Sequence, residues 1–206
     1  MKRPPLVAAI VYEGLCTFEF GIVTEAFALP RPELGRPWYR FRVCSIAGRS
    51  VRATGGVTIE APSGLTGLRD AHTIVIPGWR NVDEPPPAIL LSALRRAAAR
   101  GARIVSICSG VFVLAAGGLL NGQRATTHWR DTQPLAERFP DIIVQPDVLY
   151  VDEGRVMTSA GSAAGLDLCL HIIRKDFGAE IANRVARRLV LPPHRTEVRR
   201  STPQSR

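Results

Sequence analysis

Short, almost uninterrupted apolar runs alternate along the chain with longer segments whose apolar residues recur at helical spacing. A run that is apolar at every position is typical of a strand buried on both faces of a parallel sheet. In the helical segments the apolar side chains share one face and the charged ones lie on others. The pattern predicts strands at residues 6–12, 41–46, 73–76 and 104–107, and helices at residues 17–29, 88–100 and 109–120.

Two further segments predict antiparallel pairs. Residues 51–60 surround a Thr-Gly-Gly turn, and residues 148–152 and 155–159 flank a turn at Glu153-Gly154. Helices at residues 163–177 and 179–189 follow, with Gly178 between them. This order predicts an α/β fold, a three-layer α/β/α sandwich around a flavodoxin-like, doubly wound and mostly parallel sheet.

Ligands of such sheets bind beyond the carboxyl ends of the strands. Glu13-Gly14, Pro77-Gly78 and Cys108 each follow the carboxyl end of a predicted strand. We therefore expect these three places to meet in one crevice.

Cys108 stands where a strand turns directly into a helix, and this arrangement predicts a nucleophile elbow. Gly110 would remove a side chain that collides with the neighbouring strand, although Ser106 departs from the usual glycine before the nucleophile. The amides of Ser109 and Gly110 would favour a thiolate or hold an oxyanion. The alternative is an inert core thiol, because cysteine is among the most frequently buried residue types.

Two other residues are candidates for the same crevice. Glu19, in the first turn of the first helix, would serve as a hydrogen-bond partner or acid/base group for the sulfur, or would be there for helix-dipole reasons alone. His128 follows a short strand about twenty residues after the cysteine and would reach the crevice, or would be structural. We interpret His72, His171 and His194 as structural.

Composition narrows the class of protein. With 206 residues, 46% apolar and 22% charged, the chain is predicted to form one globular domain. No apolar segment approaches the length of a membrane span, and Glu13 interrupts the early apolar run before it could act as a secretion signal. Four widely spaced cysteines form no C-x-x-C pair, which predicts no metal or cofactor site and suits the cytoplasm.

The net charge of +9 is not spread over the chain. From residue 184 onward seven arginines stand against Glu197 alone, so residues 1–183 carry only +3. The body is thus not a basic nucleic-acid surface, and the basic end is either solvated or a nucleic-acid contact.

Three motifs together resemble the ThiJ/PfpI superfamily of class I glutamine amidotransferase-like domains. They are Ile107-Cys-Ser-Gly-Val-Phe-Val-Leu-Ala115, Gly118-Leu-Leu-Asn-Gly-Gln-Arg-Ala-Thr-Thr-His-Trp129 and Thr158-Ser-Ala-Gly-Ser-Ala-Ala-Gly-Leu-Asp167. The likeness runs from about residue 7 to residue 195 and implies the same fold. It implies that Cys108 is the elbow nucleophile, Glu19 its acidic partner and His128 the nearby histidine, with oxyanion amides at Gly78 and Ser109.

More narrowly, the chain resembles the amino-terminal sensor domain of AraC-family transcriptional regulators, in which a run like residues 179–195 leads into a DNA-binding domain. That resemblance implies a small-molecule ligand, a homodimer, and DNA contact only through a further carboxyl-terminal domain. We accordingly expect a domain at residues 1–195 and a polar basic tail at residues 196–206 that is too short for a helix-turn-helix.

The sequence departs from the superfamily at Trp79, where a second glycine is usual. Trp79 and Trp129 would form an aromatic wall for a small, cationic ligand, or would pack in the core.

Two alternatives to a sensor remain open. Isonitrile hydratase has a similar elbow and a similar Ala-Thr-Thr-His-Trp run, which implies a stand-alone cysteine-dependent hydratase or hydrolase. An acidic Cys108 would instead suit a redox-responsive protein.

Overall fold

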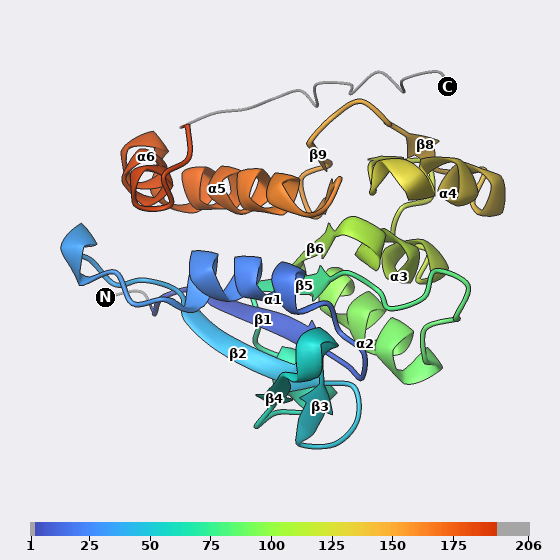
Figure 1. Cartoon of the computed structure of the whole chain (residues 1–206), viewed down its shortest axis with the longest axis horizontal. Coiled ribbons are helices and arrows are strands. Elements are labelled where there is room, and N and C mark those ends of the chain that lie inside the picture. The colour runs from blue at the N-terminus through green and yellow to red at the C-terminus, as the bar shows by residue number, and fades with distance from the viewer. Residues whose placement is uncertain (1–2, 193–206) are drawn as a thin grey trace.

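The central sheet has six strands in the order β2-β1-β5-β6-β10-β9 (Figure 1). The computed structural model describes residues 3–192. β1, β2, β5, β6 and β10 run parallel, and β9 is antiparallel at one edge. The strands are β1 (Leu6–Val11), β2 (Arg40–Ser45), β5 (Thr73–Pro77), β6 (Arg103–Ile107), β9 (Tyr150–Asp152) and β10 (Val156–Ser159). The four predicted buried strands are confirmed to within two residues at each end.

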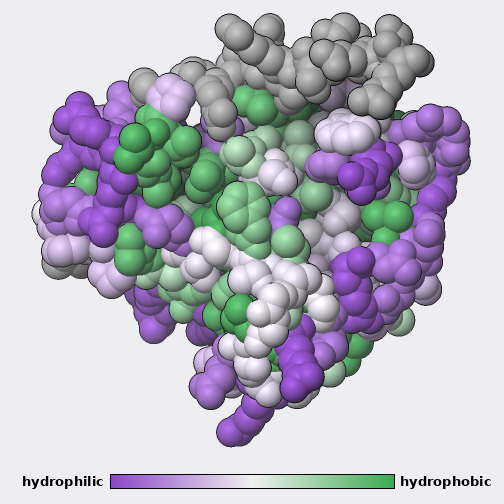
Figure 2. Space-filling model, in the orientation of Figure 1, coloured by the Kyte–Doolittle hydropathy of each residue, from purple (hydrophilic) through white to green (hydrophobic). Residues whose placement is uncertain are grey.

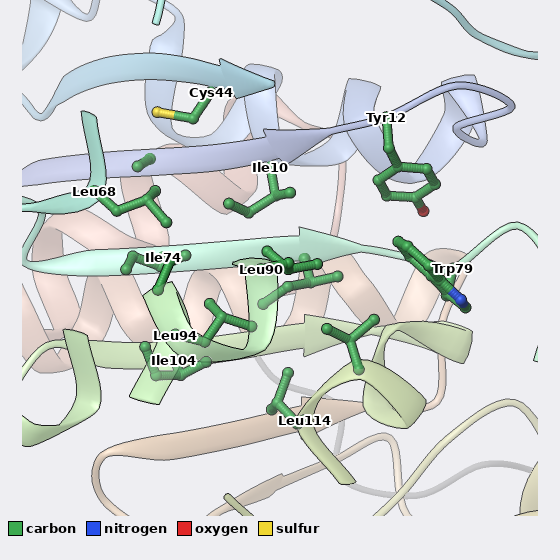
Figure 3. Packing of buried hydrophobic residues seen from close by; sticks show 14 of the residues in the cluster. Ile10, Tyr12, Cys44, Leu68, Ile74, Trp79, Leu90, Leu94, Ile104 and Leu114 are labelled. Atoms are coloured by element: carbon green, nitrogen blue, oxygen red, sulfur yellow. The ribbon is translucent and has the colours of Figure 1, made fainter. Parts of the chain in front are cut away.

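Helices cover both faces of the sheet and complete the three predicted layers (Figure 1). One face packs against α1, α5 and α6, and the other against α2 and α3. Leu90, Leu94 and Leu114 meet Ile74 and Ile104 in the second of these cores (Figure 3). The helices are α1 (Thr17–Val23), α2 (Ala88–Ala99), α3 (Val111–Ala116), α4 (Thr132–Arg138), α5 (Ala163–Phe177) and α6 (Ala179–Arg188).

Two predicted helices differ from the structure. The first ends at Val23 and continues as a π-helical turn, η1 (Thr24–Ala28). The third begins at Val111, after a 3₁₀ turn η5 (Cys108–Gly110), and stops at Ala116 before a pair of glycines. Several short elements were not predicted, among them the 3₁₀ turns η2 (Pro32–Leu34) and η4 (Leu65–Leu68), helix α4 and strand β8 (Ile143–Val144). β8 pairs with β7 (Arg124–Ala125).

Both predicted antiparallel pairs are confirmed. β3 (Ser50–Arg52) pairs with β4 (Thr58–Glu60), and β9 pairs with β10 across the Glu153-Gly154 turn. The segment that follows β4 then pairs with the carboxyl end of β2 at its outer edge. There the Ser45 amide donates to the Ser63 carbonyl at 2.9 Å.

A partly buried ion pair joins the amino end of β6 to the last turn of α5. Arg103 donates from both terminal nitrogens to the Asp176 carboxylate, at 2.7 and 3.0 Å. The Tyr39 hydroxyl donates to the same carboxylate at 2.7 Å, so Asp176 has a partner on each oxygen.

Among residues 3–192, no helix is both long and apolar enough to cross a membrane. The predicted polar tail at residues 196–206 lies outside the described residues, and the domain boundary at residue 195 stays a prediction.

We predict that Asp176→Ala lowers the free energy of unfolding by about 2 kcal/mol, because it leaves the partly buried Arg103 guanidinium without its charged partner. The matched control is Asp70→Ala, which breaks the Arg42–Asp70 pair at 2.6 Å, where the aspartate side chain is 53% exposed. That change should cost about 0.5 kcal/mol. Urea denaturation measures both, and equal losses would contradict the assignment of Arg103–Asp176 as a structural pair.

Candidate functional site

The backbone turns sharply at Cys108, directly after strand β6. Its φ of +55° lies in the left-handed region, which costs an L residue about 1–2 kcal/mol. Such strain persists only where the surroundings enforce it, and it is common at functional sites. The predicted sharp strand-to-helix turn at Cys108 is therefore confirmed, and the role of the cysteine as a nucleophile stays a prediction.

Two glycines make room for this turn. A Cβ on Gly110 would lie 2.6 Å from the Ile76 carbonyl oxygen of β5, as the sequence predicted. A Cβ on Gly161 would lie 2.5 Å from the Cys108 Cβ and 2.7 Å from its sulfur. The backbone of the loop after β10 thus lies directly against the cysteine at Gly161. The Ser-Ala-Gly-Ser motif by itself did not predict this role for the glycine.

Hydroxyl groups fasten the elbow to two other loops. The Ser109 hydroxyl donates to the Trp79 carbonyl and accepts from the Trp79 amide, both at 2.8 Å. The Thr127 hydroxyl donates to the Cys108 carbonyl at 3.0 Å. The loop after β1 contacts the loop after β5, where the Tyr12 hydroxyl donates to the Pro77 carbonyl at 3.4 Å. The three strand ends are thus linked in the order of their strands in the sheet, and the crevice between them stays a prediction.

Glu19 lies in the first turn of α1 and is 5% exposed. Its Oε2 atom is buried and has no hydrogen-bond partner within residues 3–192. The carboxylate charge raises the pKa of the Cys108 thiol, which puts Glu19 within electrostatic reach of the sulfur. An unpaired buried carboxylate oxygen is costly, so it is a place for a donor hydrogen.

Tyr12 and Cys16, which were not predicted as site residues, interact electrostatically with Glu19. Cys16 stands at the start of α1, where burial, followed by the Glu19 side chain, raises the pKa of its thiol. Tyr12 follows β1, and burial raises the pKa of its hydroxyl, with Cys16 and Glu19 adding to the shift. Both residues follow the carboxyl end of β1, and this position in the sequence could have identified them as candidates for the site.

Burial raises the pKa of Cys108 to about 11. The Ser109 amide lowers it, as predicted, but the charges of Glu19, Asp131 and Cys16 act with burial in the other direction. The expectation of a stabilised thiolate is therefore wrong. The cause is that one amide at the start of a six-residue helix does not offset desolvation among acidic neighbours.

Gly78 has the left-handed backbone, φ +78°, that its place in the loop requires. Its amide donates to the Ile107 carbonyl at 3.0 Å and to the Ile76 carbonyl at 3.1 Å. Of the two predicted oxyanion donors, the Gly78 amide is thus already hydrogen-bonded to two backbone carbonyls. The Ser109 amide instead interacts with the Cys108 sulfur and lowers the pKa of its thiol.

Trp79 is 4% exposed and packs against Tyr12, with ring centroids 4.6 Å apart (Figure 3). Its indole nitrogen donates to the Glu84 carbonyl at 2.9 Å. Trp129 is 71% exposed and lies beside the Arg130 guanidinium. The two tryptophans therefore do not form the predicted aromatic wall, since one is in the core and the other on the surface.

His128 begins the 3₁₀ turn η6 (Trp129–Asp131), and its Nδ1 accepts from the Arg130 amide at 3.3 Å. Its neighbour Thr127 touches the elbow, so the histidine lies in the predicted loop, but no hydrogen bond to Cys108 is found among the described residues. Within residues 3–192, no group of three or more His, Cys, Asp or Glu side chains is placed to hold a metal ion.

His171 is not merely a core residue. Its Nε2 lies 2.7 Å from Asp152 Oδ2, which also accepts from Lys175 at 2.7 Å. Burial would raise the pKa of Asp152, but the hydrogen bonds from Lys175 and His171 outweigh it and lower that pKa. This cluster ties the β9–β10 hairpin to α5.

A family model described as the DJ-1/PfpI family matches residues 7–175. The HTH-type transcriptional regulator GbdR of Pseudomonas aeruginosa is 24% identical over 196 residues, which is 95% of this chain and 53% of the regulator. Isonitrile hydratase of Pseudomonas putida is 36% identical over 105 residues, 50% of this chain and 44% of that enzyme. The chain spans about half the length of these curated relatives.

A crystal structure of an AraC family transcriptional regulator from Pseudomonas putida superposes with a TM-score of 0.80 at 21% identity. The match covers 90% of this chain and all of the chain in that structure. The likeness shows that the two share a fold.

We predict that Gly161→Ala costs about 3 kcal/mol or more of stability, because left-handed strain adds to a collision with the cysteine. Gly154→Ala is the matched control, since its φ of +82° is close to the +86° of Gly161 but nothing lies within 4 Å of its added Cβ. It should cost about 1 kcal/mol. Thermal and urea unfolding test this, and similar losses at the two positions would rule out the close approach to Cys108.

We predict that Glu19→Gln speeds alkylation of Cys108 at pH 8 about threefold or more. Removing the carboxylate charge lowers the thiol pKa from its value of about 11, and the thiolate is the reactive form. Iodoacetamide labelling followed by peptide mass spectrometry measures the rate. Glu60→Gln, at an exposed position on β4, should leave it unchanged. A slower rate in Glu19→Gln would mean that the carboxyl group assists the thiol instead.

Proposed function

We propose that this chain, which belongs to the DJ-1/PfpI family, is the ligand-sensing domain of an HTH-type transcriptional regulator. The observation that carries the proposal is the match to GbdR, which takes in 95% of this chain but 53% of that regulator. A sensor of this kind would bind a small molecule and would act on DNA through a separate domain. A homodimer and a cytoplasmic location, which the family resemblance and the composition imply, stay part of the proposal.

The place where several loops meet at Cys108 is the proposed ligand site. The cysteine touches the loop after β10 at Gly161 and the loop after β7 at Thr127, and Ser109 beside it holds the loop after β5. A ligand that contacts the sulfur would therefore lie next to several loops and could shift them together. The unpaired Glu19 oxygen and the nearby Asp131 charge favour a ligand that carries hydrogen-bond donors or positive charge.

Two features favour binding over turnover. Cysteine catalysis needs a thiolate, and the pKa of Cys108 is raised to about 11. It also benefits from free amides around the developing oxyanion, and the Gly78 amide is already bonded to two carbonyls. The same raised pKa weighs against the redox-responsive alternative, because peroxide reacts with the thiolate.

A cysteine-dependent hydratase is the second candidate. It is favoured by the strained elbow beside a buried, unpaired carboxylate oxygen, and by the 36% identity to isonitrile hydratase. In this role Cys108 would attack the substrate, Glu19 would carry protons and the Ser109 amide would stabilise the developing charge. The overall reaction would add one water to the isonitrile carbon and give an N-substituted formamide.

Two measurements on the purified chain separate these functions. In the first, a panel of small amino acids and amines is tested for an increase in melting temperature. We expect at least one compound to bind, to stay chemically unchanged by NMR, and to bind Glu19→Gln about tenfold more weakly, because a charge-assisted contact is lost.

The second measurement incubates the chain with cyclohexyl isocyanide and follows formamide formation by NMR. The sensor proposal predicts no conversion above the buffer rate. Conversion that disappears in Cys108→Ala, but persists in a Cys169→Ala control at a fully buried thiol of α5, would replace the sensor with the hydratase.

A further inference from the structure

An arginine lies buried at the opposite end of the sheet from Cys108. Arg31 is 2% exposed, and it precedes the 3₁₀ turn η2. Its Nη2 donates to the Glu25 carbonyl at 2.8 Å and lies 3.5 Å from the Glu25 carboxylate. Its Nε and Nη1 are buried and have no hydrogen-bond partner within residues 3–192. Burying a guanidinium with two nitrogens that donate no hydrogen bond is costly, so the buried position of Arg31 needs an explanation.

A cavity of about 380 Å³ adjoins this arginine. Its walls are Ala28, Pro30, Arg31, Pro32, Arg36, Trp38 and Tyr39. The indole nitrogen of Trp38 is also buried without a partner among the described residues, and the Arg31 guanidinium lies 5.6 Å from the centre of the Trp38 ring. Arg36 is exposed at the same cavity and stacks over Phe177, 4.7 Å from the ring centre.

Positive charge exceeds negative charge around the cavity. Burial lowers the pKa of Arg31, Glu25 offsets part of that effect, and the nearby Arg188 lowers it further by repulsion. Glu33 is already engaged, because its carboxylate pairs with Arg188 at 3.1 Å and its carbonyl accepts from Arg184. Figure 2 shows hydrophilic side chains gathered over this end of the molecule, where α6 lies.

We propose that this cavity binds a small anion through a phosphate or carboxylate group, held by Arg31, Trp38 and Arg36. The Nε and Nη1 atoms of Arg31 lie on different edges of its guanidinium, so each would donate a separate hydrogen bond to the anion. The Trp38 indole N–H supplies a third donor, and Arg36 supplies a second charge at the exposed side. The volume lies in the range of small-molecule sites.

This site is separate from the proposed ligand site at Cys108. Trp38 and Tyr39 precede β2 at the amino end of the parallel sheet, whereas Cys108 follows the carboxyl end of β6. In Figure 1, α6 lies towards one end of the molecule and α3, which follows the elbow, towards the other. The inference does not rest on the proposed function and would survive its failure.

The test titrates the purified chain, in Tris buffer, with sodium phosphate and separately with sodium succinate, against sodium chloride of equal ionic strength. We expect a saturable rise in melting temperature for at least one of the two anions. Arg36→Gln should weaken the apparent affinity about tenfold, because one charged contact is lost. Trp38→Phe keeps the ring but removes the donor and should weaken binding as well. A larger effect of phosphate or of succinate identifies the preferred group.

Two controls make the result specific. Arg95→Gln removes an exposed arginine from α2, and Arg187→Gln removes one from the neighbouring face of α6, and both should bind as the unaltered chain does. Arg31→Met should abolish binding, and if it fails to fold, the Arg36 and Trp38 variants decide. An equal response in all variants, or a loss in Arg187→Gln but not in Arg36→Gln, would overturn the proposal.

Discussion

The left-handed backbone at Cys108 is the constraint on which the site depends. It exists because Gly110 gives the elbow room against β5 and Gly161 lets a second loop lie on the sulfur. With a side chain at either position, one of the two contacts would be lost. The elbow, the loop after β5 and the loop after β10 are therefore one packed unit, and the Ser109 and Thr127 hydroxyls fasten it at two further points.

Much of this arrangement could be predicted because it follows from local pattern. Uninterrupted apolar runs identified the parallel strands, and Gly178 separated two helices that the structure places at Ala163–Phe177 and Ala179–Arg188. Gly110 was predicted correctly because a strand followed at once by a helix needs a small residue there. The short α4 and β8 were missed because a seven-residue helix and a two-residue strand carry too little periodicity to be recognised.

The chemistry of the site could not be predicted in the same way, because it depends on competing effects between distant residues. The Ser109 amide acts on Cys108 as expected, but burial and the charges of Glu19 and Asp131 outweigh it. The Gly78 amide looks free in sequence, yet the Ile107 carbonyl of the next strand takes it. Arg31 gave no signal at all, since nothing in its neighbourhood along the chain shows that it lies within the interior.

The strip of chain that pairs with the carboxyl end of β2 limits how two such molecules can join. Because the Ser63 carbonyl already takes the Ser45 amide, β2 cannot accept a foreign strand there without first losing that cover. Pairing of a foreign strand with the carboxyl end of β2 is thus blocked at this bridge. Covering the end of an edge strand in this way is one means by which proteins shield unpaired backbone groups from another chain.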